Sequence, residues 1–265
     1  MSDRIRQTVV TVSAVVAVVG SFIGSGAAGG TPIQDAAGGA LGADSTLIAP
    51  AGPAFSIWSV IYLGLIAYAV WQFLPAQTHS PRQRILGYPI AVTLLLNAAW
   101  ILSVQAGLLA LSAVVIAVLL IALLFTFVRV VRTRRRGQGW VQSIVVDGTV
   151  GLYLGWVSIA TAANVTALLT ASGFDGFGWP ADAWGVAIVI VAGLAGLALA
   201  VFGEGRLSPT ASLAWGLVWV AVSRTTGTLP SAAVAATAIA TASALVVATV
   251  IIRLVAERTA RASRD

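Results

Sequence analysis

The chain has 265 residues, of which 58% are hydrophobic and 9% are charged, whereas a soluble domain carries about a quarter charged residues. With a mean hydropathy of +0.96, this composition excludes an ordinary soluble protein and indicates an integral membrane protein. The net charge is +6, but the arginines lie in short loops between apolar runs, so we expect no nucleic-acid partner. The absence of cysteine and the single histidine, His79, argue against a disulfide and a haem or zinc centre built from side chains.

Eight apolar runs have a length close to the roughly 17–25 residues that cross about 30 Å of hydrocarbon. In chain order they are Thr8–Ile23, Ala54–Leu74, Ile85–Val104, Gly107–Val131, Val141–Leu169, Ala183–Phe202, Leu207–Ser223 and Pro230–Val255. The first and the seventh are of marginal length. We therefore expect an all-α integral membrane protein with eight spans.

The arginines indicate the orientation of these spans. With the N-terminus in the cytoplasm, fourteen of the fifteen arginines fall on the cytoplasmic side and Arg224 falls outside. The acids Asp35, Asp44, Asp175 and Asp182 fall on the outer side. Because cytoplasmic loops carry an excess of basic residues, this distribution favours eight spans with both termini cytoplasmic.

The first apolar run permits two interpretations. A basic start, an apolar stretch and the sequence GSGAAGG imitate a secretory signal peptide. Gly20 and Gly24, and then Gly26 and Gly30, recur at a spacing of four residues. Small residues at this spacing allow two membrane helices to approach closely, so we favour a retained helix.

The spans fall into two groups. Residues 1–170 hold five spans, residues 171–182 form a turn-rich external linker, and residues 183–265 form a three-helix extension with a basic cytoplasmic tail. The longest loop, Gly24–Gly52, is rich in glycine and lies on the predicted outer side. Long loops of this kind are often functional, so we expect it to cover a cavity as a lid.

Three spans repeat aromatic or amide residues at helical spacing. They are Phe55, Trp58 and Tyr62 in the second, Asn97 and Trp100 in the third, and Trp156, Ala160 and Asn164 in the fifth. A buried amide is costly without a partner, so Asn97 and Asn164 should point into the bundle. A cavity lined in this way suits a flat, mostly apolar molecule with a few polar groups.

The same residues also fit a role in packing alone. Asparagine in membrane helices commonly bonds one helix to another. Trp71, Trp140 and Trp179 fit interface anchors, and Trp215 and Trp219 fit packing or the same aromatic belt. On the residues alone, we favour packing over ligand binding for these faces.

Asp147 is the acid inside the fifth predicted span. An intramembrane carboxylate suggests a functional group. The arginine cluster that ends at Arg136 lies close by in the sequence, however, and the long span allows its start to lie in the interface. We therefore expect an interfacial ion pair.

Four stretches carry a resemblance to a known family. They are APAGPAFSIWSVIY, LNAAWILSVQAGLLALS, a basic loop followed by GW, and YLGWVSIATAANV. In this order and spacing, residues 9–169 resemble the TspO/MBR family, the tryptophan-rich sensory proteins related to the translocator protein. Residues 183–256 form three helices that the usual member lacks, so the chain resembles an enlarged branch.

The resemblance implies a five-helix membrane bundle, commonly dimeric, that binds porphyrins in a pocket opening toward the loop Gly24–Gly52. A TspO-like five-helix bundle with three additional transmembrane helices is the expected fold. The implied ligand-binding residues are Trp58, Tyr62, Asn97, Trp100, Trp156, Ala160 and Asn164. No cofactor is required, and a porphyrin or haem-type molecule is the implied ligand. The expected partners are a small hydrophobic ligand, membrane lipid and, as the family allows, a second copy of the chain.

The leading functional hypothesis is a membrane sensor or carrier that binds a tetrapyrrole. All fifteen basic residues are arginine, which suggests a GC-rich bacterial genome and hence the bacterial cytoplasmic membrane. A passive or partner-assisted transporter of small hydrophobic molecules and a regulatory membrane scaffold are the alternatives. We expect no enzyme, because no acid–base, nucleophile or metal constellation is visible. The light-driven tetrapyrrole breakdown attributed to family members is a minor alternative.

Overall fold

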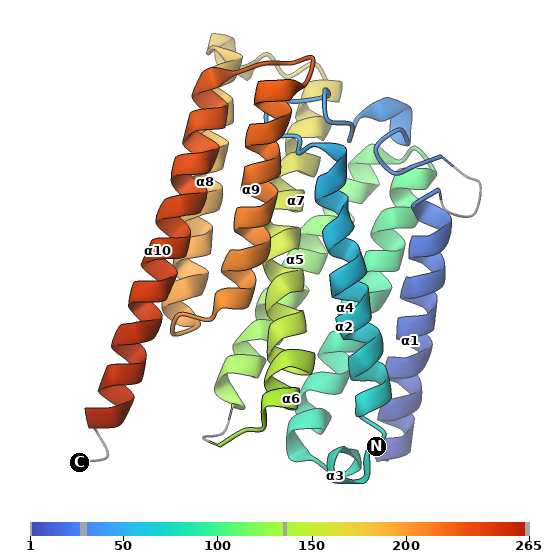
Figure 1. The fold of residues 1–265 in the computed structure, drawn as a ribbon. Coiled ribbons are helices and arrows are strands. Elements are labelled where there is room, and N and C mark those ends of the chain that lie inside the picture. The colour runs from blue at the N-terminus through green and yellow to red at the C-terminus, as the bar shows by residue number, and fades with distance from the viewer. Residues whose placement is uncertain (1, 27–30, 135–136, 263–265) are drawn as a thin grey trace. The chain divides into compact units, whose positions relative to one another are not determined.

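The computed structural model describes residues 2–26, 31–134 and 137–262, and the regular structure of these residues is helical (Figure 1). The long helices are α1 (Asp3–Gly24), α2 (Ile57–Trp71), α4 (Pro81–Gln105), α5 (Leu109–Arg132), α7 (Thr149–Ala171), α8 (Ala181–Phe202), α9 (Leu207–Thr226) and α10 (Ala232–Ala262). Short elements connect them: α3 (Pro75–Thr78), α6 (Trp140–Gln142), the 3₁₀-helices η1 (Ala37–Gly39), η2 (Gly52–Ser56) and η4 (Gly176–Gly178), and the π-helix η3 (Ser143–Gly148). Gly30 and the cluster residues Arg135 and Arg136 lie outside the described residues.

Among the described residues, seven helical stretches are long and apolar enough to cross a membrane. They are Asp3–Gly24, Gly52–Trp71, Pro81–Gln105, Leu109–Arg132, Trp140–Ala171, Ala181–Phe202 and Ala232–Ala262. The chain is thus an integral membrane protein. The seventh predicted span forms α9, a helix of 20 residues that is not among these seven. The count of eight spans and the cytoplasmic position of both termini stay predictions.

The chain separates into two compact units. Unit 1 comprises Met1–Leu41 and Ser56–Val150, and unit 2 comprises Gly42–Phe55 and Gly151–Asp265. One boundary between the two units thus lies within the first turn of α7. The sequence analysis placed a linker at residues 171–182, and that division stays a prediction. The loop Gly24–Gly52 is also divided, since its last part belongs to unit 2.

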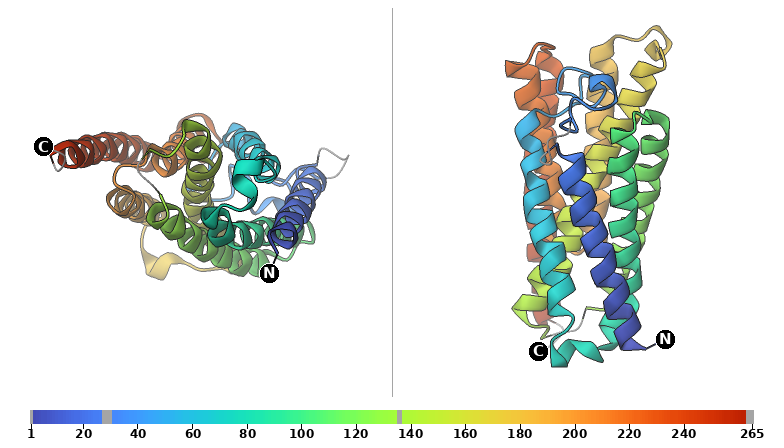
Figure 2. Two further views of the ribbon diagram at one scale, coloured as in Figure 1. Left: turned by 90° about the horizontal axis from the view of Figure 1, so that it is seen from below. Right: turned by 90° about the vertical axis from the view of Figure 1, so that its right-hand side faces the viewer.

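In unit 1, the helices α1, α2, α4 and α5 run side by side (Figures 1 and 2). The helices α1 and α4 approach each other closely. A side chain added at Gly24 would collide with Ile101, and Gly20 lies against Ala98. The close approach expected from the spacing of Gly20 and Gly24 is confirmed. Lipid provides no hydrophobic force to press helices together, so such close packing is what holds them.

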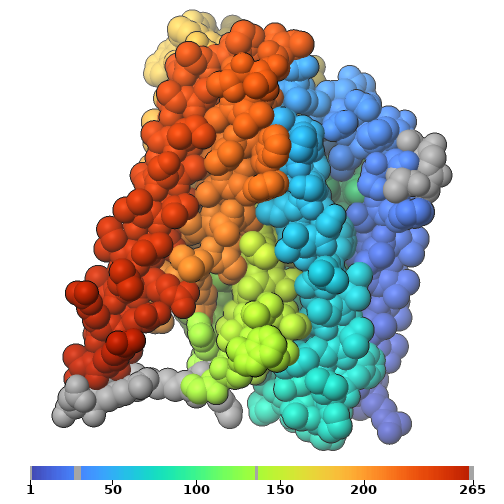
Figure 3. All heavy atoms as spheres, in the orientation of Figure 1, coloured from blue at the N-terminus to red at the C-terminus, as the bar shows by residue number. Residues whose placement is uncertain are grey.

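In unit 2, α9 packs along α10 (Figure 3), and α8 packs against α10. The segment Gly42–Phe55 is bonded to α9. The backbone N–H of Ala51 donates to the Trp219 carbonyl at 3.1 Å, and the Trp215 indole N–H donates to the Ala54 carbonyl at 2.9 Å. Arg224 donates to the Ala43 carbonyl at 2.5 Å. These bonds fix the second part of the predicted lid loop onto α9.

Candidate functional site

Four side chains from α2 and α4 lie together in unit 1, and we refer to Trp58, Tyr62, Asn97 and Trp100 as the α2–α4 aromatic site. The rings of Trp58 and Trp100 are stacked, with centroids 6.3 Å apart and an interplanar angle of 27°. The ring of Tyr62 lies 5.4 Å from that of Trp58. The Asn97 amide N–H donates to the Tyr62 hydroxyl. The structure thus brings together the four residues that the sequence placed on facing helices.

The α2–α4 aromatic site contains polar atoms as well as rings. Asn97 is 1% exposed and Trp100 is 4% exposed, whereas Trp58 and Tyr62 are half-buried. Among the residues that the structure describes, the Asn97 carbonyl oxygen and the Trp100 indole N–H have no hydrogen-bond partner. A buried polar group without a partner is unfavourable. The site therefore offers stacked rings together with one acceptor and one donor for a molecule that binds against it.

Phe55 lies outside the α-helix that carries Trp58 and Tyr62, although the sequence analysis placed all three in one span. The α-helix begins at Ile57, and Phe55 lies in η2, a 3₁₀-helix that contains Pro53. A proline and a glycine at the start of the run favour a turn over an α-helix. Phe55 belongs to unit 2, where its ring meets that of Trp156 edge-on at 5.7 Å.

The remaining predicted site residues lie on α7 in unit 2. Trp156 and Asn164 are buried and Ala160 is half-buried. The hydroxyls on this helix are satisfied locally, because Ser158 donates to the Leu154 carbonyl at 2.8 Å and Thr161 to the Val157 carbonyl at 2.7 Å. Bonds of this type allow hydroxyl side chains inside a membrane helix. The role of Trp156, Ala160 and Asn164 in ligand binding stays a prediction.

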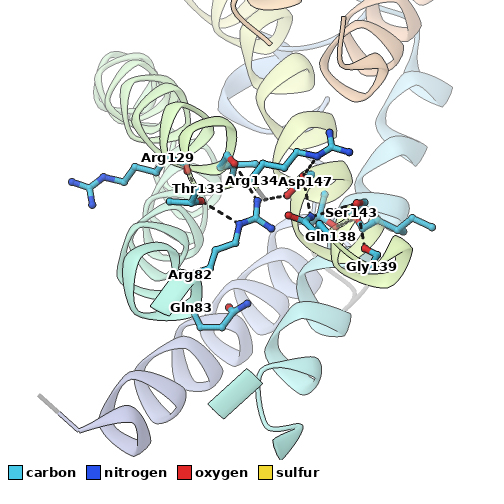
Figure 4. Close-up of polar contacts among 12 residues, drawn as sticks. Arg82, Gln83, Arg129, Thr133, Arg134, Gln138, Gly139, Ser143 and Asp147 are labelled. Atoms are coloured by element: carbon cyan, nitrogen blue, oxygen red, sulfur yellow. Dashed lines mark hydrogen bonds and ion pairs between the residues drawn. The ribbon is translucent and has the colours of Figure 1, made fainter. Parts of the chain in front are cut away.

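A buried ion pair joins α4 to η3 in unit 1 (Figure 4). The Arg82 guanidinium donates to the Asp147 carboxylate at 2.5 Å, and each side chain is 7% exposed. Arg82 also donates to the Val130 carbonyl and to the Thr133 hydroxyl at the end of α5, both at 3.1 Å. Gln138 donates to the second Asp147 oxygen at 3.3 Å. The pair and its neighbours tie together the ends of α4, α5 and η3.

The ion pair at Asp147 agrees in kind with the sequence analysis, although its main partner differs. Arg134, a member of the predicted arginine cluster, lies 4.0 Å from Asp147. Arg82, more than sixty positions earlier in the chain, is closer. The π-helix η3 contains Asp147, and such irregular turns often occur at functional sites. The sequence around Asp147 therefore could not predict that Arg82 is its main partner.

Comparison with known families identifies the chain. A family model described as TSPO-like protein matches residues 10–251. The chain belongs to the TSPO-like family. The match runs through α8 and α9 and into α10, so the TSPO-like family model includes the region that the sequence analysis had set apart as an extension.

No significant match was found among curated proteins or among solved structures. The TSPO-like family and the membrane-helical architecture together indicate a membrane protein that binds or transports a ligand. Within residues 2–26, 31–134 and 137–262, no three His, Asp or Glu side chains come close enough to hold a metal ion.

The predicted interface tryptophans of this TSPO-like protein have different environments. Trp140 is 75% exposed and Trp179 is 65% exposed, as suits interface anchors. Trp71, in contrast, is buried at the end of α2. Trp215 and Trp219 pack edge-on at 5.6 Å, which fits the packing role considered for them.

Sequence reasoning did not identify a buried polar group near the first turns of α1 and α4. It consists of Arg6 and Gln7 on α1, Tyr68 and Gln72 at the end of α2, and Gln83 on α4. The Gln7 side-chain amide donates to the Gln72 backbone carbonyl at 2.9 Å. The signal in the sequence was weak. Arg6, Gln7 and Gln83 flank apolar runs, where polar residues are ordinary, and Tyr68 and Gln72 are scattered polar residues near the end of the run Ala54–Leu74.

Proposed function

We propose that unit 1 binds a flat, mostly apolar ligand against the α2–α4 aromatic site, and that this ligand is a tetrapyrrole such as a porphyrin. The observation that carries the proposal is the combination of stacked, half-buried rings with a buried acceptor and a buried donor that have no partner among the described residues. The protein acts in this proposal as a sensor or carrier in the bacterial cytoplasmic membrane.

The rings account for the shape of the ligand. Trp58 and Trp100 lie nearly parallel, and Trp58 and Tyr62 retain partial exposure. Aromatic rings prefer offset-stacked or edge-on neighbours, so a planar conjugated molecule extends the existing stack. A bulky, non-planar ligand would make fewer stacking contacts with these rings.

The polar atoms account for the functional groups of the ligand. A free-base tetrapyrrole has ring N–H donors, ring nitrogen acceptors and carboxylate acceptors. The Asn97 carbonyl oxygen can accept from the first, and the Trp100 indole N–H can donate to the others. Pairing these two atoms removes the penalty of leaving them buried and unsatisfied. Membership of the TSPO-like family supports ligand binding of this general kind.

A titration of the purified full-length protein with protoporphyrin IX tests the proposal. Saturable changes in the porphyrin absorption band report binding. Trp100→Phe keeps an aromatic ring, smaller than the indole, and removes the indole N–H, so we expect a dissociation constant about 2–10-fold higher than for the wild type, as one hydrogen bond implies. Trp140→Phe, at a position that is 75% exposed, is the matched control and should bind as the wild type does.

Two results would contradict the proposal. One is an absence of saturable binding by the wild type in detergent and in lipid nanodiscs. The other is equal binding by wild type, Trp100→Phe and an Asn97→Leu variant that removes the carbonyl acceptor. Circular dichroism of each variant shows whether it retains the helical fold.

A passive or partner-assisted transporter is the second candidate, since the family and the membrane-helical architecture fit transport as well as binding. Flux of a fluorescent porphyrin into proteoliposomes distinguishes the two functions. Flux above that of protein-free liposomes favours transport, and saturable binding without flux favours a sensor.

A further inference from the structure

A second set of polar side chains in unit 1 lies apart from the α2–α4 aromatic site. It consists of Arg6 on α1, Tyr68 on α2, and Arg82 and Gln83 on α4, and we refer to it as the donor cluster. The Tyr68 hydroxyl donates to the Gln83 carbonyl oxygen at 3.0 Å, and the positive charges of both Arg6 and Arg82 act on Tyr68. In Figure 4, Gln83 leaves α4 in a direction different from that of Arg82.

The donor cluster has more hydrogen-bond donors than acceptors. Arg6 is 2% exposed and Gln83 is fully buried. Among the described residues, the Arg6 side chain makes one hydrogen bond, from Nη2 to the Thr78 backbone carbonyl at 3.0 Å. Within the described part of the chain, Arg6 Nε and Nη1, Gln83 Nε2 and Arg82 Nη1 have no acceptor, whereas Gln72 Oε1 is the one buried acceptor of the neighbouring polar group without a donor. Buried donors of this kind are nearly always satisfied in folded proteins, so the cluster is suited to a ligand that is rich in acceptors.

The charge of the donor cluster is also unbalanced. Asp147 pairs with Arg82 at 2.5 Å. Arg6, in contrast, forms no ion pair among the described residues. The acid on its own helix, Asp3, is bound to Arg84 at 2.7 Å and to His79 at 3.0 Å. The charge of Arg6 acts on the Asp3 carboxylate, but that acid is not within ion-pair distance of Arg6 and is bonded to two other groups. A buried cation whose charge is only partly compensated is unfavourable, so the expected ligand carries negative charge.

The surrounding structure holds Arg6 in this position. A side chain at Gly87 would collide with Cγ and Cδ of Arg6, so the glycine lets the arginine stem lie directly against α4. Gln83 and Arg82 lie in the first turn of α4, which begins at Pro81 and has 25 residues. The N-terminal end of a long helix carries partial positive charge that favours an anion.

We propose that the donor cluster binds a phosphate-type oxyanion. Guanidinium groups match the geometry of phosphate oxygens and donate to them through charge-assisted bonds. The predicted apolar runs begin at Thr8 and Ile85, two and three residues after Arg6 and Arg82. The cluster therefore lies where these helices leave the hydrocarbon, at the level of lipid phosphates. A phospholipid head group and free inorganic phosphate share the chemistry that the cluster recognises.

This site is independent of the proposed ligand site. Tyr68 lies six residues beyond Tyr62 on α2, which is about 9 Å along the helix axis. The experiment below contains no porphyrin, so its outcome is separate from that of the porphyrin titration.

Native mass spectrometry of the full-length protein, released from detergent, provides the first arm of the test. Because the donors are enclosed, we expect a bound phospholipid to be retained during purification. Arg6→Gln removes the unpaired charge and should reduce the lipid-bound fraction at least about tenfold, as loss of a charge-assisted contact implies. Arg4→Gln, which changes an exposed arginine two positions away on the same helix, should leave it unchanged.

Gln83→Glu tests the same idea without removing Arg6. The new carboxylate lies beside the unpaired donors and supplies the missing negative charge from within the protein. We expect this variant to fold with unchanged or higher thermal stability and to lose the bound lipid. It keeps the proposal testable if Arg6→Gln does not fold.

Thermal unfolding of delipidated protein provides the second arm. If no lipid is retained, inorganic phosphate should raise the unfolding temperature of the wild type saturably, relative to chloride at equal ionic strength, and should not do so for Gln83→Glu. Either a lipid adduct or phosphate stabilisation that depends on these residues supports the proposal and identifies the source of the oxyanion. Neither effect, or equal effects in the wild type and the variants, overturns it.

Discussion

Arg82 and Asp147 show how unit 1 accommodates a charge inside its helices. The Asp147 carboxylate accepts hydrogen bonds from Arg82 and Gln138. Arg82 also donates to a backbone carbonyl and to a hydroxyl at the end of α5. Taking two charges out of water is costly, and only good geometry with further hydrogen bonds compensates for it. The pair is thus a fixed connection between three chain segments.

Removing one partner of this pair should destabilise the protein strongly. Asp147→Asn leaves the buried Arg82 charge without its counter-charge, and we expect a loss of about 3–5 kcal/mol in the free energy of unfolding. Thermal unfolding in detergent measures the change.

The exposed pair of Arg253 and Glu257, with both side chains 48% exposed, provides the matched control. Glu257→Gln should cost no more than about 0.5 kcal/mol, as is usual for exposed pairs one helical turn apart. Equal unfolding temperatures for Asp147→Asn and Glu257→Gln would show that the buried pair is not a stabilising connection.

Individual residues differ in how far the sequence predicted them. Asn97 and Trp100 are three positions apart, and helical periodicity alone placed them on one face. Asp147 was expected in an ion pair, but Arg82 as its main partner was not, because the pair joins segments that are 65 positions apart. The same reason explains why Arg6 and Gln83 were missed. Periodicity reports neighbours on one helix and carries no information about which helices meet.

At the scale of elements, the contact of α7 with α9 in unit 2 depends on a glycine. A side chain added at Gly155 would collide with the backbone carbonyl of Pro209 and with Ser212. A backbone group cannot move aside as a flexible side chain can. The contact therefore requires that position 155 carries no side chain.

Gly155→Ala should separate the two helices and lower stability. We expect a cost of about 1–3 kcal/mol, which is typical of inserting a group into a well-packed interior. Gly139→Ala makes the same chemical change at a position with open space around it and should be close to neutral. Comparable unfolding temperatures for the two variants would contradict the close approach of α7 to α9.

The sequence predicted the elements better than their ends. Each predicted apolar run corresponds to a long helix, because a membrane span needs a continuous apolar stretch that periodicity and length can detect. The second run was taken to be helical from Ala54, but Gly52 and Pro53 produce a 3₁₀-helix and α2 begins at Ile57. Within the fifth run, the π-helix Ser143–Gly148 has no sequence signal comparable to a proline.

At the scale of the whole molecule, the number of membrane spans depends on α9. The sequence predicts eight spans, whereas seven described stretches are apolar enough by length and composition. Polar residues of α9 such as Thr210, Ser212 and Ser223 are buried within unit 2, which explains how a helix of lower hydropathy can still cross the membrane. The excess of arginine on one side is the reason for the prediction that it does.

Cysteine labelling tests this prediction directly, because the chain has no native cysteine. Glu204→Cys lies before α9 and Thr228→Cys after it, and both positions are exposed. With eight spans, a membrane-impermeant maleimide should label position 228 in intact cells and position 204 only after permeabilisation. Gln77→Cys, in a predicted cytoplasmic loop, is the internal control. Labelling of 204 and 228 from the same side would exclude α9 as a span.

The resemblance found in residues 9–169 led to the right family, and the family match extends to residue 251. The predicted division into a five-span domain, a linker and an extension stays a prediction. A turn-rich stretch suggested a linker at residues 171–182, whereas the compact units divide within α7 and within the loop Gly24–Gly52. The bonds of Ala43, Ala51 and Ala54 to α9 account for the position of that loop segment in unit 2. Alanine backbone contacts of this kind have no sequence signature.

The most direct test of ligand binding at the α2–α4 aromatic site is the affinity of the purified protein for protoporphyrin IX, measured side by side for the wild type, Trp58→Ala and Trp140→Ala. Trp58 lies at the centre of the α2–α4 aromatic site, and its loss should raise the dissociation constant about tenfold or more through lost ring contacts and buried area. Trp140→Ala should bind as the wild type does. Equal affinities for all three proteins would contradict a ligand site on α2 and α4.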